Sequence, residues 1–316
     1  MTSLFSTRII MANQETDFNM MPDFDVMNES EKIIYNLLDS IPLLRDFHSP
    51  SGQVYRLLES VSRSSISILF GEDGVQKHVV GDFGTIDFPY FSMGSINSTH
   101  LFGLDELIIF AFYESNKERY KNVADLGANI GLHSIIMTKL GWDVTAYEPD
   151  PVHFEQLRSN LSRNGGCDGQ NSPKLLNKAV SVEVGEVEFI RVVGNTTGSH
   201  IAGSKSNPYG DLDKFMVSVD SFRDICNNFD LLKIDVEGHE ADMLLSTEKE
   251  DWQGTDAIVE IGSVGNAEKV FHHFSNLALN LFSQKQAWQK VNSLEDMPFS
   301  YKDGSLFISS GDVMPW

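Results

Sequence analysis

The stretch Asp125-Leu126-Gly127-Ala128-Asn129-Ile130-Gly131 connects the end of an apolar strand to a helix that we expect over residues 131–140. Small residues at such a turn let the backbone approach a ligand closely, and the first turn of the helix leaves backbone N–H groups free. Asn129 stands where glycine would be usual, and asparagine tolerates the left-handed backbone better than most side chains. The stretch therefore predicts a ligand-binding turn between a strand and a helix.

An acidic residue marks the end of the next expected strand. Glu148 follows Gly131 by 17 residues and stands in the sequence Tyr147-Glu148-Pro149-Asp150. A carboxylate at this position of a dinucleotide-binding fold accepts hydrogen bonds from both hydroxyls of a ribose. The turn and the acid together predict a ligand that contains a nucleoside.

The turn differs from the nicotinamide fingerprint Gly-x-Gly-x-x-Gly, which cradles a pyrophosphate. Asn129 replaces the second glycine of that fingerprint, and Leu132 replaces the last one. Asp125 opens the turn with a negative charge instead. A carboxylate suits a ligand with a cationic end, such as the ammonium and sulfonium groups of S-adenosylmethionine. We therefore predict S-adenosylmethionine as the cofactor and predict against NAD.

From about residue 122 onward, strand and helix patterns alternate, which is typical of a parallel sheet covered by helices. The expected strands of this α/β fold span 123–125, 144–148, 174–180, 231–235 and 257–261, with an antiparallel pair at 279–282 and 305–309. The expected helices span 131–140, 152–164, 240–246 and 269–276. Two further β runs, at 186–193 and 214–219, flank a loop rich in Gly, Ser and Asn.

The residues before this alternation predict an accessory region. We expect a flexible tail over 1–28, an α+β accessory or lid region over 29–103, and the main domain over 104–316. Asn28 or Ser30 can cap a first helix, and a second helix is expected over 54–62. A hairpin is expected from 66–70 and 75–80, and a third helix over 104–113. The aromatic, loop-rich stretch 81–103 leads us to expect a lid over the acceptor site.

Composition excludes several classes of protein. The chain has 316 residues and a net charge of −21, so its surface repels phosphate backbones and anionic lipids. Its longest apolar stretch, 107–113, is far shorter than the roughly 20 residues that span a bilayer. Two cysteines are too few for a disulfide framework or a zinc cluster. We expect a cytoplasmic protein without a signal peptide and without nucleic-acid or membrane partners.

Several motifs together resemble the FkbM-type family of class I S-adenosylmethionine-dependent methyltransferases. Besides 125–131, they are Tyr-Glu-Pro-Asp-Pro at 147–151, Asn-Lys-Ala-Val at 177–180, Thr-Gly-Ser at 197–199 and Lys-Ile-Asp-Val-Glu-Gly-His-Glu at 233–240. The last block is the most specific, and the similarity extends from about residue 104 to 309. The resemblance implies the Rossmann-like, seven-stranded methyltransferase sheet with helices on both faces.

The resemblance also implies roles for the residues that match these motifs. Gly127, Asn129 and Gly131 would hold the methionine part of the cofactor, and Glu148 would hold its ribose. The adenine would lie between Lys178 and Ala179. Glu106, on the helix before the glycine turn, could reach the cofactor ammonium group or could be an ordinary solvated acid.

Candidate catalytic residues follow the fourth expected strand. A hydroxyl acceptor needs a base that removes its proton, or a metal that lowers its pKa. Asp235, Glu237 and His239 lie at the carboxyl edge of the sheet, where open α/β sheets bind ligands. Glu260 ends the neighbouring strand, so Asp235 and Glu260 are candidate ligands for Mg²⁺. The alternative is an ion pair of either carboxylate with Lys233.

The leading functional hypothesis is methylation of a hydroxyl on a sugar, glycan or natural product, which is the commonest chemistry that the resemblance implies. The acceptor would be a small molecule or a glycan. Two alternatives remain open: N-methylation of a peptide or amine, and a cofactor-binding protein that has lost catalysis. The presence of Asp125, Glu148 and Asp235 argues against such a loss. The sequence leaves the oligomeric state open.

Overall fold

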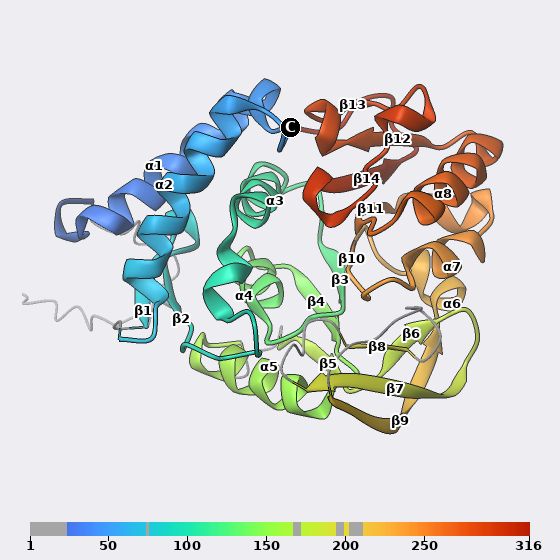
Figure 1. The fold of residues 1–316 in the computed structure, drawn as a ribbon, viewed down its shortest axis with the longest axis horizontal. Coiled ribbons are helices and arrows are strands. Elements are labelled where there is room, and N and C mark those ends of the chain that lie inside the picture. Colours follow the sequence, from blue (N-terminus) through green and yellow to red (C-terminus); the bar gives the residue numbers. More distant parts are fainter. Residues whose placement is uncertain (1–23, 74–75, 167–171, 194–198, 202–210) are drawn as a thin grey trace, which may run out of the picture.

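The structure is a computed structural model that describes residues 24–73, 76–166, 172–193, 199–201 and 211–316. Its centre is an eight-stranded sheet (Figure 1). The strand order is β13 (Gln289–Lys290), β12 (Asn280–Ser283), β14 (Ser305–Ser309), β11 (Asp256–Glu260), β10 (Leu231–Ile234), β3 (Asn122–Leu126), β4 (Asp143–Tyr147) and β5 (Lys174–Leu176). Strands β11 to β5 run parallel, whereas β14 is antiparallel to β11 and β12. The fold class is as predicted, and the one strand beyond seven is the two-residue edge strand β13.

Helices cover both faces of this sheet because alternate residues of each central strand point to opposite sides. Val123 packs in the core beneath α3 (Leu104–Ser115), α4 (Leu132–Lys139) and α5 (Pro151–Arg163). Its neighbour Ala124 packs in a second core beneath α6 (Phe222–Cys226), α7 (Glu240–Leu245) and α8 (Val264–Leu277). The sheet is therefore the middle of three layers, and its carboxyl edge stays open for a site.

A smaller sheet lies beside the carboxyl edge of the main one (Figure 1). Its order is β6 (Ala179–Ser181), β9 (Asp211–Ser221), β7 (Gly185–Val193) and β8 (His200–Ile201). The strand expected over 174–180 is therefore wrong as a single element, because β5 belongs to the main sheet and β6 to the small one. Asn177 stands at the break, and its side-chain amide donates to the carbonyl oxygens of Glu148 and Pro149.

The N-terminal part begins with helices, as predicted, and a pair of short strands follows them. After η1 (Phe24–Val26) come α1 (Glu29–Ser40), η2 (Ile41–Phe47) and α2 (Gln53–Phe70). Asn28 caps α1 as expected, in a reciprocal capping box with Glu31. The predicted hairpin is wrong, because residues 66–70 complete α2, and β1 (Lys77–Val79) pairs with β2 (Thr85–Asp87). The apolar run 66–70 was too short to distinguish a buried helix end from a strand.

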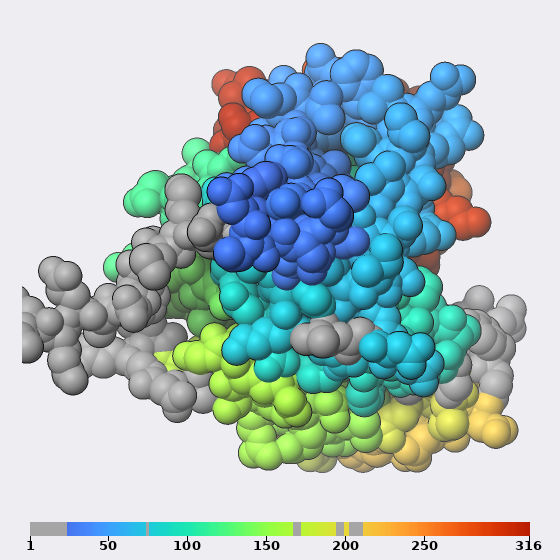
Figure 2. All heavy atoms as spheres, turned by 90° about the vertical axis from the view of Figure 1, so that its left-hand side faces the viewer, coloured from blue at the N-terminus to red at the C-terminus, as the bar shows by residue number. Residues whose placement is uncertain are grey.

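Short 3-10 turns complete the chain: η3 (Gly81–Phe83), η4 (Ser98–Phe102), η6 (Lys249–Trp252), η7 (Gln284–Gln286), η8 (Leu294–Asp296) and η9 (Tyr301–Asp303). Helices α1 and α2 lie on one face of the molecule (Figure 2) and share a continuous apolar core with α3 and α4. No helix in the described part of the chain has both the length and the apolar character needed to cross a membrane. The expected tail falls mainly on residues 1–23, outside the described residues.

Candidate functional site

The glycine turn after β3 is held against two neighbouring strands. The backbone N–H groups of Gly127 and Ala128 both donate to the carbonyl oxygen of Tyr147, at 3.0 and 2.9 Å. Gly127 has a φ of +82°, and a Cβ placed on it would lie 1.8 Å from the carbonyl oxygen of Asp235. Only glycine lets the chain pass this close to the end of β10. The turn thereby brings the ends of three parallel strands together.

Glu148, directly after β4, is held by backbone groups from both sides. Its Oε2 accepts from the N–H of Asn129 at 2.8 Å, and its Oε1 accepts from the N–H of Asp150 at 2.8 Å. Burial raises the pKa of the Glu148 carboxyl to about 8. The hydrogen bonds from the two backbone N–H groups favour the ionised form, in which each carboxylate oxygen can accept a second hydrogen bond. A fixed pair of acceptors of this kind matches two adjacent hydroxyls on a ligand.

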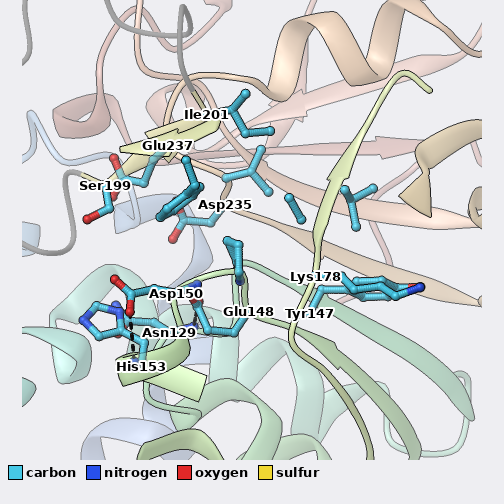
Figure 3. A pocket seen from close by; sticks show the side chains of 16 residues that line it. Asn129, Tyr147, Glu148, Asp150, His153, Lys178, Ser199, Ile201, Asp235 and Glu237 are labelled. Carbon is cyan, nitrogen blue, oxygen red and sulfur yellow. Dashed lines mark hydrogen bonds between the residues drawn. The ribbon is translucent and has the colours of Figure 1, made fainter. Parts of the chain in front are cut away.

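A cleft of about 620 Å³, open solvent included, lies over this turn. Figure 3 shows Asn129, Glu148 and Asp150 on one side of it and Ser199, Asp235 and Glu237 on the other. The lining residues are Gly127, Asn129, Tyr147, Glu148, Pro149, Asp150, His153, Lys178, Ala179, Val180, Phe189, Ser199, Ile201, Asp235, Val236 and Glu237. This cleft, named the cofactor cleft after the predicted ligand, is therefore walled by both sheets.

Two predicted cofactor residues lie behind the turn and do not line this cleft. Asp125 is fully buried, accepts from the hydroxyl of Ser134 at 2.6 Å and lies 3.8 Å from Lys233 Nζ. Gly131, at φ +95°, lets Leu157 approach, since a Cβ there would lie 2.6 Å from the Leu157 side chain. Both residues support the shape of the turn, while Gly127, Asn129 and Glu148 face the cleft.

The residues expected near the adenine do line the cleft. Ala179, in β6, lies on its wall, and so does Lys178. The ammonium group of Lys178 donates to Asp220 Oδ1 at 2.8 Å, which fixes the direction of its side chain. Val180 and Phe189 add apolar surface beside them. This end of the cleft is therefore apolar, with one cation at its margin.

A second cavity adjoins the cofactor cleft. Its lining consists of Asp105, Glu106, Ile109, Lys233, Ile234, Asp235, Ile258, Glu260, Tyr301, Gly304 and Ser305. Asp235 lines both cavities and therefore marks their junction. Glu106 faces the second cavity, where its Oε2 lies 2.8 Å from His133 Nε2, and His133 Nδ1 in turn lies 3.1 Å from the Tyr113 hydroxyl.

Asp235, Glu260 and Lys233 form the charged centre of the second cavity. Lys233 Nζ donates to Asp235 Oδ2 at 3.3 Å. Burial opposes ionisation of Asp235, but the charge of Lys233 prevails and holds the pKa of Asp235 below its ordinary value. Burial and the Asp235 charge hold the pKa of Glu260 well above its ordinary value. Of the two carboxyl groups, Asp235 is therefore the one that ionises more readily.

The predicted metal site is not supported. Within the described ranges, no group of three or more His, Cys, Asp or Glu side chains could hold a metal ion. The ammonium group of Lys233 already lies beside Asp235, at 3.3 Å from its Oδ2. This donor set does not fit Mg²⁺, and the alternative prediction of an ion pair with Lys233 is found for Asp235.

The two remaining catalytic candidates point to different places. Glu237 has a φ of +58° and lines the cofactor cleft. The ring of His239 is not in either lining; its Nε2 lies 2.8 Å from Ser181 Oγ, and its Nδ1 lies 3.5 Å from Asp242. Buried Glu240 shapes this turn by accepting from the N–H groups of Val236 and Gly238. Glu237 can therefore contact a ligand, whereas His239 fastens α7 to the small sheet.

Sequence reasoning missed a residue pair at the rim of the cleft. Asp150 caps α5 by accepting from the N–H groups of Val152 and His153, and it also receives two hydrogen bonds from Arg191 in β7. The sequence Asp150-Pro151 was a recognisable helix start. Nothing in the sequence indicated the partner 41 residues away.

The N-terminal region lies outside the cleft lining. Among the described residues, none from 24–103 lines the cofactor cleft. Phe91 contacts the lining residue His153, with ring centroids 6.3 Å apart. The lid and the boundary at 103/104 stay predictions, and Thr197 and Gly198 of the Thr-Gly-Ser motif lie outside the described residues.

Comparisons with known proteins agree with the motifs. A family model described as Methyltransferase FkbM domain matches residues 125–287, just over half of the chain. Methyltransferase sdnD of Sordaria araneosa is 27 % identical over 166 residues, which cover 42 % of this chain and 62 % of that protein. The chain thus spans less than two thirds of this curated relative.

Solved structures of methyltransferases are also similar, at low identity. The methyltransferase FkbM from Methylobacillus flagellatus KT is 13 % identical with a TM-score of 0.36, and the match covers 67 % of this chain and 54 % of that one. The structure described as StiE O-MT is 14 % identical with a TM-score of 0.33, covering 57 % of this chain and 52 % of that one.

Proposed function

Since the chain belongs to the FkbM methyltransferase family, we propose that it transfers a methyl group from S-adenosylmethionine to a hydroxyl of a sugar, glycan or natural product. The observation that carries this proposal is the clamped carboxylate of Glu148 in the cofactor cleft. Both of its oxygens are fixed by backbone N–H groups, one of them from the glycine turn itself. The ribose of the cofactor offers the two adjacent donors that such a pair accepts.

The residues of the cofactor cleft fit the other parts of this cofactor. Asn129 Oδ1 is buried and has no hydrogen-bond partner among the described residues, so a ligand donor would satisfy it. The apolar end near Ala179, Val180 and Phe189 suits a purine ring. In the second cavity, the Glu106 carboxylate suits the ammonium group. When bound, S-adenosylmethionine supplies an electrophilic methyl group.

Asp235 is the residue that we assign to the acceptor hydroxyl. It lies where the cofactor cleft meets the second cavity, so a hydroxyl placed in the second cavity reaches the cofactor beside it. Lys233 keeps Asp235 ionised, and an ionised carboxylate accepts the hydroxyl proton as the new C–O bond forms. Holding the hydroxyl and the methyl group in a fixed geometry lowers the activation free energy further, by up to about 7–11 kcal/mol.

Transfer of radiolabel from S-adenosylmethionine to a panel of sugars, polyols, phenols and amines tests this proposal. We expect a labelled methyl ether and a loss of transfer in Asp235→Asn of roughly 10²-fold or more, as for a lost general base. The matched control is Asp224→Asn, which changes an exposed acid on α6 and should leave transfer unchanged. Label on amines alone would establish the N-methyltransferase alternative. Cofactor binding without transfer to any acceptor would favour a non-catalytic homologue.

A further inference from the structure

An ion pair between half-buried Arg191 and buried Asp150 connects the small sheet to the main one at the rim of the cofactor cleft. Arg191 Nε donates to Asp150 Oδ2 at 2.6 Å, and Arg191 Nη2 donates to Asp150 Oδ1 at 2.6 Å. The exposed fractions of the two side chains are 16 % for Arg191 and 1 % for Asp150. Two parallel charge-assisted hydrogen bonds of this kind fix direction as well as distance. The pair is therefore a rigid link between β7 and the start of α5.

The small sheet in turn holds Arg191 in place. Asp213, its partner across the β7–β9 ladder, accepts from Arg191 Nη1 at 3.1 Å. The guanidinium group also lies over the ring of Phe215, 5.0 Å from its centre. Burial opposes ionisation of Asp150, but the hydrogen bonds from Arg191 hold its pKa below the ordinary value. Asp150 is thus an anion whose direction is set by β7.

The link continues from Asp150 to Glu148. The backbone N–H of Asp150 donates to Glu148 Oε1 at 2.8 Å, so a shift of Asp150 shifts one of the two oxygens that face the cofactor cleft. Arg191 itself does not line that cleft, whereas Asp150 and Glu148 both do. Asp150 is the lining residue to which Arg191 donates hydrogen bonds, so it is the direct route from Arg191 to a bound ligand.

We propose that Arg191 is a positioning residue that orients Glu148 for the ribose hydroxyls of the cofactor. This inference rests on the proposed function, because it assumes that the cleft takes a ribose. Without Arg191, the buried Asp150 carboxylate lacks its main partner and must turn toward water, and the N–H that it presents to Glu148 turns with it. Lysine at this position keeps the positive charge but cannot donate the two parallel hydrogen bonds to Asp150.

The test compares S-adenosylhomocysteine with its 2′-deoxy analogue by isothermal titration calorimetry. The wild-type protein should bind S-adenosylhomocysteine at least tenfold more tightly than the analogue, because Glu148 accepts from the 2′-hydroxyl. In Arg191→Gln we expect S-adenosylhomocysteine to bind at least tenfold more weakly and the preference to fall below threefold. The affinity and the preference of Arg191→Lys should lie between those of the wild type and those of Arg191→Gln. All titrations are run well below the melting temperature of each variant, which circular dichroism provides.

The matched control is Lys214→Gln. Lys214 forms an exposed ion pair with Glu188, at 2.9 Å, between the same two strands, and has no path to Glu148. This variant should keep both affinities. An equal loss of affinity for both ligands in Arg191→Gln, with the wild-type preference retained, would overturn the inference, because it would mean a purely structural role. A wild-type protein that binds neither ligand would instead refute the proposed function.

Discussion

Replacing Gly127 with alanine tests the close approach between the glycine turn and β10. The added Cβ would lie 1.8 Å from the carbonyl oxygen of Asp235, and real Cβ contacts are not found below 3.0 Å, so the two segments must separate. The left-handed backbone of Gly127 also costs alanine roughly 1–2 kcal/mol. Overpacking against rigid backbone adds about 1–3 kcal/mol. The separation moves Gly127 away from Asp235, and both line the cofactor cleft.

Gly141→Ala is the matched control for this change. Gly141 has a φ of +80°, nearly that of Gly127, but a Cβ on it meets nothing within 4 Å. It therefore carries the same backbone cost without the collision. Urea denaturation should show Gly127→Ala to be less stable than Gly141→Ala by about 1–3 kcal/mol. Calorimetry should show at least tenfold weaker binding of S-adenosylhomocysteine in Gly127→Ala only.

Equal stability of the two alanine variants would refute this reasoning, because it would mean that the collision with Asp235 is relieved at no cost. Unchanged affinity in Gly127→Ala would show that the geometry of the turn does not control the cleft. A loss of affinity of the same size in Gly141→Ala would mean that any change near α4 weakens binding, and that the collision at Gly127 is not the cause.

Three further predictions follow from particular groups. In the folded state the pKa of Glu148 is about 8 rather than 4.5, so its contribution to stability is complete below pH 4.5 and is lost as the pH rises to about 8. Glu148→Gln should therefore gain about 4 kcal/mol relative to wild type between pH 5 and 9 in urea denaturation, and a pH-independent difference would contradict this. Asn28→Ala breaks the capping box of α1 and should lower the free energy of unfolding by about 1 kcal/mol, whereas an unchanged value would show that the cap is dispensable. Treatment with EDTA should leave methyl transfer unchanged, because Lys233 holds the position beside Asp235 that a cation would need; restoration of a lost rate by Mg²⁺ would reverse this assignment.

The strand–helix alternation and the family were predictable from the sequence because each depends on local pattern. The turn at 125–131 lies between β3 and α4, and Glu148 directly follows β4, as expected. The family is confirmed by the match over 125–287. The antiparallel pair at the end of the chain is also confirmed, as β12 and β14. Short-range periodicity was sufficient for these elements.

Features that depend on contacts between distant segments were not predictable. The run 66–70 completes a helix because Ile66, Leu69 and Phe70 pack in the core shared with α3, whereas Ile68 stays exposed. Asp125 matches its motif, but its carboxylate is turned inward to Ser134. The pairing of Arg191 with Asp150 depends on how the small sheet folds over the cleft. A motif thus predicts which residues matter, but the tertiary fold decides what each side chain contacts.

A crystal structure of the protein with S-adenosylhomocysteine tests the central claim most directly. We expect the ribose hydroxyls at hydrogen-bonding distance, about 2.6–3.2 Å, from both oxygens of Glu148. The adenine should lie beside Ala179, and the amino group should point toward Glu106. Electron density for the ligand outside this cleft, or a ribose that does not contact Glu148, would contradict the claim.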